Sequence, residues 1–162
     1  MMKVRDVMNP EPVAIQATAA VSDAVRLLRT EEISGMPVLE GEKLVGVVSE
    51  SDLLKILSVE REGGLWLPSP LEILEVPIRD LIRWERLQAE AEEAGTMTVS
   101  EVMTRKVFTV VPEDSIQRAA SMMVRHRINR LPVLEGDDLV GIVTRGDIIA
   151  GLGMEASEVE ED

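Results

Sequence analysis

The sequence predicts an α/β protein in which two β-α-β-β-α repeats pack together with pseudo-twofold symmetry. The chain is duplicated, because residues 4–57 and 99–152 align without a gap at a constant offset of 95 positions. Within each copy, short apolar runs typical of strands alternate with helical spacing of apolar residues. Each copy spans about 54 residues, a length at which an isolated core is marginal, so we expect the two copies to complete one another.

The first half of each repeat contains an extended run followed by a helix. The extended runs lie at residues 13–15 and 107–111. The helices follow from apolar residues spaced three and four apart, and Asp114 with Ser115 marks the start of the second helix. The apolar residues at this spacing are Val21, Ala24, Val25 and Leu28 in repeat 1, and Ile116, Ala119, Ala120, Met123 and Val124 in repeat 2.

The second half of each repeat contains a hairpin and a closing helix. In repeat 1 the strands at 37–39 and 44–48 are joined by a turn at 40–43, and the counterpart turn is 135–138. Gly41 and Gly136 permit the positive φ that tight hairpins require. The closing helices are predicted to begin near Asp52 and Asp147, which are suitable helix caps.

Three shared motifs carry a resemblance to a known family. Both repeats open with Val-x-x-Val-Met, at Val4–Met8 and Val99–Met103, and both contain a Pro-Val strand followed by glycine and then Gly-x-x-Ser/Thr-x-x-Asp. Each repeat therefore resembles a cystathionine-β-synthase (CBS) domain, and the tandem resembles a Bateman module. The resemblance covers about two thirds of the chain.

The resemblance implies a regulatory function. Such pairs bind AMP, ADP, ATP or S-adenosylmethionine in the clefts between their repeats, commonly form homodimers, and act on a separate effector protein, here unknown. It implies no catalytic cofactor and no catalysis. A structural or dimerisation module whose sites no longer bind ligand is the alternative.

The chemistry of the Ser/Thr-x-x-Asp element fits a nucleoside. The hydroxyl can donate to a ribose or phosphate oxygen, the carboxylate can accept from both ribose hydroxyls, and the preceding glycine lets the backbone approach a ligand closely. The following helix N-terminus favours phosphate. The competing interpretation is that Asp52 and Asp147 only cap helices. The predicted nucleotide-binding residues are Ser34, Met36, Pro37, Ser49, Ser51 and Asp52 in repeat 1, and Val111, Pro112, Asn129, Arg130, Leu131, Pro132, Thr144, Arg145 and Asp147 in repeat 2.

The repeats differ in charge at this element. Arg130 and Arg145 of repeat 2 correspond to Gly35 and Glu50 of repeat 1. We therefore expect repeat 2 to hold the better anionic site, with Arg130 meeting phosphate. The neighbouring Arg125 and Arg127 are interpreted as a solvated helix end, and His126 as a boundary histidine.

Composition excludes several classes of function. The net charge of −13 argues against nucleic-acid binding, and a chain with one histidine and no cysteine offers neither a multi-His metal site nor thiolate catalysis. No group of activated side chains indicates an enzyme. No apolar run approaches the ~20 residues of a membrane span, so we expect a cytoplasmic protein without membrane contact. Abundant glutamate indicates a thermophilic source.

Two further segments complete the predicted organisation of repeat 1 (1–57) and repeat 2 (99–152). Residues 58–98 are predicted to form a helical connecting segment, with a helix at 78–94 and the two tryptophans, Trp66 and Trp84. This segment is either an effector or dimerisation element or a packed crossover. Residues 153–162 are predicted to be a solvated, frayed acidic tail.

Overall fold

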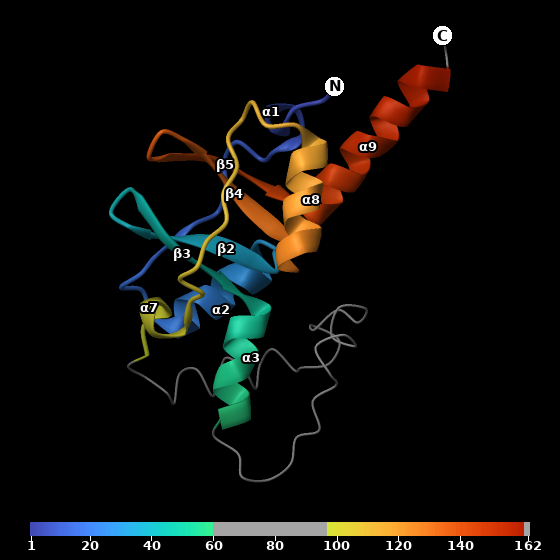
Figure 1. Cartoon of the computed structure of the whole chain (residues 1–162). Helices are drawn as coiled ribbons and strands as arrows, with labels where there is room; N and C mark the ends of the chain where they lie inside the picture. Colours follow the sequence, from blue (N-terminus) through green and yellow to red (C-terminus); the bar gives the residue numbers. More distant parts are fainter. Residues whose placement is uncertain (60–96, 161–162) are drawn as a thin grey trace. The chain divides into compact units, whose positions relative to one another are not determined.

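The computed structural model describes residues 1–59 and 97–160, which form two packing units (Figure 1). The C-terminal unit comprises Met1–Val13, Gly41–Leu44 and Lys106–Asp162, and the central unit comprises Ala14–Glu40 and Val45–Arg105. These units do not follow the sequence repeats. The opening segment of repeat 1 packs with the body of repeat 2, and the opening segment of repeat 2 packs with the body of repeat 1.

The central unit contains a three-stranded sheet of order β1-β2-β3, and β1 runs parallel to β2 with Ile15 opposite Val38. The order β-α-β-β-α predicted for repeat 1 is confirmed, and α7 is added from repeat 2. The elements are β1 (Ile15–Gln16), α2 (Val21–Thr30), β2 (Gly35–Glu40), β3 (Lys43–Ser49, in this unit from Val45), α3 (Glu50–Val59) and α7 (Val99–Val102).

The C-terminal unit is built on an antiparallel pair, β4-β5, in which Arg130 lies opposite Thr144. The run at 107–111 was predicted as a strand, but in the structure it contributes a single parallel bridge between Val110 and Val133. Helices α8 and α9 lie side by side (Figure 1). The elements are α1 (Val4–Val7), α8 (Ile116–His126), β4 (Arg130–Glu135), β5 (Asp138–Thr144) and α9 (Arg145–Glu160).

The apolar spacing predicted both helices, but it wrongly included Val124 among the residues of the apolar face. All four apolar residues predicted in α2 are buried, as are Ile116, Ala119 and Met123 of α8. Ser115 is the N-cap of α8, where its hydroxyl oxygen accepts from the N–H of Arg118 at 3.1 Å. Val124 is 80% exposed, because it lies about 80° around the helix from Ile116, at the edge of the buried stripe.

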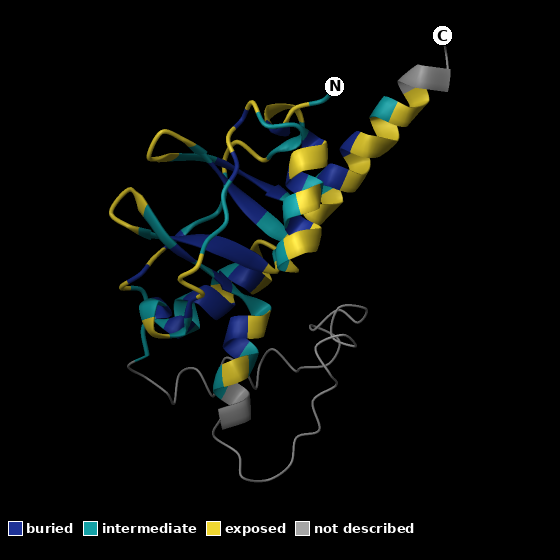
Figure 2. Ribbon diagram, viewed as in Figure 1, coloured by how far each residue is buried: buried dark blue, intermediate teal, exposed yellow. Residues whose placement is uncertain are grey.

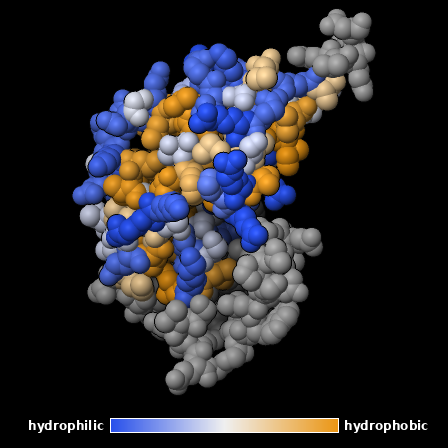
Figure 3. Space-filling model, viewed as in Figure 1, coloured by the Kyte–Doolittle hydropathy of each residue, from blue (hydrophilic) through white to orange (hydrophobic). Residues whose placement is uncertain are grey.

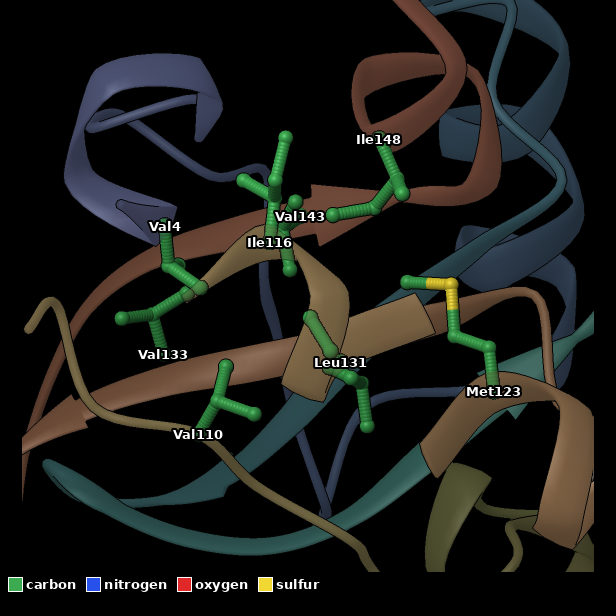
Figure 4. Packing of buried hydrophobic residues seen from close by; sticks show 9 residues of the cluster. Val4, Val110, Ile116, Met123, Leu131, Val133, Val143 and Ile148 are labelled. Atoms are coloured by element: carbon green, nitrogen blue, oxygen red, sulfur yellow. The ribbon is translucent and has the colours of Figure 1, made fainter. Parts of the chain in front are cut away.

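The core of the C-terminal unit includes a residue from the start of the chain. Figure 2 shows buried positions in α8, α9 and the β4-β5 pair, and Val4 of α1 packs among the buried residues of these elements (Figure 4). Backbone hydrogen bonds hold α1 there, since the Val4 N–H donates to the Asp114 carbonyl and the Arg5 N–H donates to the Pro112 carbonyl. The cluster consists of Val4, Val110, Ile116, Ala119, Met123, Leu131, Val133, Val143 and Ile148.

The methionine of each opening segment lies against the glycine of the opposite repeat. A Cβ at Gly141 would stand 2.7 Å from the Met8 sulfur, and a Cβ at Gly46 would stand 2.6 Å from the Met103 sulfur. We expected these glycines to admit a ligand to the backbone, but each makes room for a methionine side chain. By contrast, Gly41 and Gly136 have φ of 64° and 63°, as the hairpin turns predict.

The acidic C-terminal segment is helical rather than frayed through residue 160. Its Glu155 carboxylate accepts from the N–H of Met2 and, at 2.8 Å, from the side-chain amide of Gln117. Figure 3 shows hydrophobic side chains at the surface where α9 runs. No described helix is both long enough and apolar enough to span a membrane. The helix predicted at 78–94 and both tryptophans lie outside the described residues.

Candidate functional site

The Ser/Thr-x-x-Asp element lies at a strand-to-helix junction in each unit. Thr144 ends β5 immediately before α9, and Ser49 ends β3 immediately before α3. The Thr144 N–H donates to Asp147 Oδ2 at 2.8 Å, and the Asp147 N–H donates back to Thr144 Oγ1 at 3.3 Å, which is a reciprocal capping box. Ser49 N–H donates to Asp52 Oδ2 at 2.9 Å. Each aspartate therefore caps its helix through one carboxylate oxygen.

The two carboxylate oxygens of Asp147 differ in their hydrogen bonds. Oδ2 takes both bonds from Thr144, at 2.8 Å from the N–H and 2.9 Å from the hydroxyl. Oδ1 accepts no hydrogen bond from the described part of the chain, and the side chain is partly exposed. Because a carboxylate has about four acceptor positions, two remain on Oδ1.

The equivalent carboxylate in the central unit is fully engaged. Asp52 is 3% exposed, and its Oδ2 accepts from the N–H and the hydroxyl of Ser49 at 2.9 and 3.1 Å. Its Oδ1 accepts from the Thr104 hydroxyl at 2.9 Å and faces the Lys55 ammonium at 3.4 Å. The two copies of the motif therefore differ at the second carboxylate oxygen, which has partners in Asp52 and none among the described residues in Asp147.

The structure brings most predicted residues of each repeat to one junction. In the C-terminal unit, Arg145 N–H donates to the Asn129 carbonyl at 2.9 Å, beside the pair of Arg130 and Thr144. In the central unit, Glu50 N–H donates to the Ser34 carbonyl at 3.0 Å. There the Ser49 and Ser51 hydroxyl oxygens are 2.8 Å apart.

Other predicted residues are buried or lie further along the strands. Met36, Pro37, Leu131 and Pro132 are buried, and Leu131 belongs to the core cluster (Figure 4). Val110 lies beside Val133, so Val111 is level with Leu134, about 13 Å along β4 from Arg130. Val111 therefore lies towards the hairpin turn, and the buried Pro112 accepts from the Arg5 N–H of the opening segment at 3.1 Å.

Basic side chains gather at the Asp147 end of the C-terminal unit. Arg130 begins β4 and Arg145 begins α9, while Arg125 and Arg127 are exposed at the end of α8, as predicted. His126 stacks on Phe108 with ring centroids 3.6 Å apart, and Lys106 Nζ lies 5.5 Å from the Phe108 centroid. We name this set the basic end: Lys106, Arg125, Arg127, Arg130 and Arg145.

Sequence reasoning missed three participants. Thr104 and Lys55 contact Asp52, and Phe108 connects Lys106 to α8. The spacing of Asp52 and Lys55 on one helix face could have indicated their ion pair. Nothing local to Thr104 indicates its partner, which lies 52 residues away.

Comparisons with known proteins agree with this architecture. The CBS domain family model matches residues 4–59 and 99–153. The uncharacterized protein MJ1426 of Methanocaldococcus jannaschii is 40% identical over 155 residues, covering 94% of this chain and 92% of that protein. The crystal structure of CBSX2 in complex with AMP has a TM-score of 0.68 and 26% identity, covering 96% of this chain and 99% of that chain.

A second solved structure supports the fold. It is the CBS domain pair of protein MJ0100 in complex with 5-methylthioadenosine and S-adenosyl-L-methionine, with a TM-score of 0.66 and 22% identity, covering 96% of this chain and 98% of that chain. The family model alone matches about two thirds of the residues. The chain therefore belongs to the CBS domain family, as a tandem pair of these regulatory ligand-binding domains.

Proposed function

We propose that this chain is a regulatory module that senses an adenine nucleotide through Asp147 of the C-terminal unit. The observation that carries the proposal is that the two oxygens of this carboxylate are bonded differently. Oδ2 accepts two hydrogen bonds from Thr144, while Oδ1 accepts none from the described residues. Two acceptor positions on one ionised oxygen match the two hydroxyls of a ribose diol.

The basic end favours an anionic ligand. Arg145 follows Thr144 directly, and Arg130 lies opposite Thr144 across the strand pair. The α9 N-terminus adds its dipole at the same position. These charges favour the phosphates of AMP, ADP or ATP over the cationic sulfonium of S-adenosylmethionine. The AMP complex of CBSX2, which is 26% identical, supports the same choice.

The test is calorimetric titration with AMP, ADP, ATP, adenosine and S-adenosylmethionine. We expect the nucleotides to bind more tightly than adenosine, and S-adenosylmethionine to bind more weakly than any nucleotide. Replacing Arg145 by the residue at its repeat counterpart, Arg145→Glu, is expected to weaken ATP binding about tenfold at low salt, and to change adenosine binding little.

The matched control is Arg26→Glu, which makes the same charge change on an exposed side chain of the central unit. It should leave ATP binding within about twofold. Stronger binding of S-adenosylmethionine than of ATP would identify a sulfonium sensor instead. Absence of binding by all five compounds would favour the structural alternative.

We further propose that the chain acts as a homodimer that signals to a separate effector protein. Support comes from family membership and from exposed apolar side chains of α8 and α9, notably Val124, Ile149 and Met154. Sedimentation velocity is expected to show a dimer at micromolar concentration. A monomer across that range, with and without ATP, would contradict the homodimer.

A further inference from the structure

We propose that Asp52 is an internal latch, in which the Thr104 hydroxyl and the Lys55 ammonium occupy the acceptor positions that a ribose would need. Thr104 and Lys55 then determine that each chain offers one ligand carboxylate, Asp147, rather than two. The statement about ligand number rests on the proposed function. The structural role of Asp52 does not.

The hydrogen bonds of Asp52 exhaust its capacity. A carboxylate offers about four acceptor positions, and Asp52 uses two on each oxygen: two for Ser49 on Oδ2, and one each for Thr104 and Lys55 on Oδ1. With 3% of its surface exposed, the side chain has no open approach. A ribose diol could bind Oδ1 only by displacing the Thr104 hydroxyl at 2.9 Å and the Lys55 ammonium at 3.4 Å; the Lys55 side chain is 73% exposed, so Thr104 is the closer and less mobile partner.

Two counterpart residues account for the difference in bonding at Oδ1 of the two aspartates. At the offset of 95, Thr104 corresponds to Asn9 and Lys55 to Ala150. Asn9 does not bond Asp147; its amide oxygen accepts from the Glu11 N–H at 3.0 Å. Ala150 has no polar side-chain atom. The same backbone element is therefore engaged in one unit and available in the other.

The bond between Thr104 and Asp52 also attaches the opening segment of repeat 2 to the body of repeat 1. The Val47 N–H of β3 donates to the Thr104 carbonyl at 3.0 Å, and the Thr104 N–H donates to the Val47 carbonyl at 2.9 Å. The Thr104 side chain then donates to Asp52 at the start of α3. Asp52 thus ties residues 98–105 to the body of repeat 1, a structural use of a carboxylate that the family pattern associates with ligand.

Exchanging the counterpart residues tests the latch. In the variant Thr104→Asn/Lys55→Ala/Glu50→Arg, the first two changes remove the partners of Asp52 Oδ1, and the third supplies the basic residue that follows the motif in repeat 2. By calorimetry with ATP, the wild-type chain is expected to bind one equivalent, and Asp52→Asn is expected to leave that equivalent in place. The triple variant should bind a second equivalent, which Asp52→Asn removes again.

A ligand-free measurement tests the structural role independently. Thr104→Val keeps the shape of the side chain and removes the donor, so it should lower Tm by about 3–6 °C, as should Asp52→Asn. The two changes are expected to be non-additive, because they break the same bond. Asn9→Ala is the matched control at the counterpart of Thr104, and it should leave the effect of Asp52→Asn unchanged.

The outcomes separate the two proposals. Two equivalents of ATP in the wild type, one of them lost in Asp52→Asn, would overturn the latch and leave the proposed function standing. A triple variant that still binds one equivalent would also count against it. If the wild type bound no ATP, the proposed function would fail. Independently of any ligand, additive Tm shifts of Thr104→Val and Asp52→Asn would overturn the latch.

Discussion

Asp147→Asn is expected to weaken ATP binding by roughly 10²–10⁴-fold while leaving the chain folded. Asp147 Oδ1 offers two acceptor positions, and each charge-assisted bond to a ribose hydroxyl contributes about 1.5–3 kcal/mol. The substitution keeps an oxygen that can accept from Thr144, so the helix cap is largely retained. Calorimetry with ATP and with adenosine measures the loss, and both ligands should weaken together because both carry the ribose.

Electrostatics alone would act in the opposite direction. Removing a negative charge beside the basic end should favour phosphate, so weaker ATP binding in Asp147→Asn has to come from the lost hydrogen bonds. Asp138→Asn, at the exposed start of β5, makes the same charge change far along the strand from Thr144 and should leave binding within about twofold. Unchanged ATP affinity in Asp147→Asn would mean that Asp147 serves only as a helix cap.

The helix caps and the duplicated element were predictable because they are local. Ser115 and the Thr144–Asp147 box satisfy backbone groups within three residues, so their function follows from residue type and spacing. The buried stripe of α2 was predictable for the same reason, since helix periodicity determines which side chains share a face.

The partner of each opening segment was not predictable from the same patterns. Val4–Met8 and Val99–Met103 carry the same motif, and each could pack on either hairpin without violating any local preference. The structure packs each against the opposite repeat, with Met8 at Gly141 and Met103 at Gly46. The Thr104–Asp52 bond depends on that choice. Two near-identical surfaces give the sequence no local signal that separates them.

Gly141→Ala is expected to be the most destabilising small substitution in the C-terminal unit, lowering the free energy of unfolding by about 3 kcal/mol. The added Cβ would stand 2.7 Å from the Met8 sulfur and 2.8 Å from the Asn9 carbonyl oxygen. The methionine can move, but the carbonyl cannot easily do so, because Asn9 exchanges backbone bonds with Ile142 at 2.8 and 3.0 Å. Overpacking against backbone is therefore expected to reach the upper part of the usual 1–3 kcal/mol range.

Thermal unfolding measures this cost, with an expected fall in Tm of about 6–12 °C. Gly153→Ala is the matched control, because a Cβ there meets nothing within 4 Å and the residue lies in α9; it should stabilise the chain by about 0.5–1 kcal/mol. If Gly141→Ala were as benign as Gly153→Ala, Met8 and Asn9 could not be seated on β5 in solution. The packing of an opening segment on this hairpin would then be wrong, because Gly141 is required only when a methionine and the backbone that follows it lie against β5.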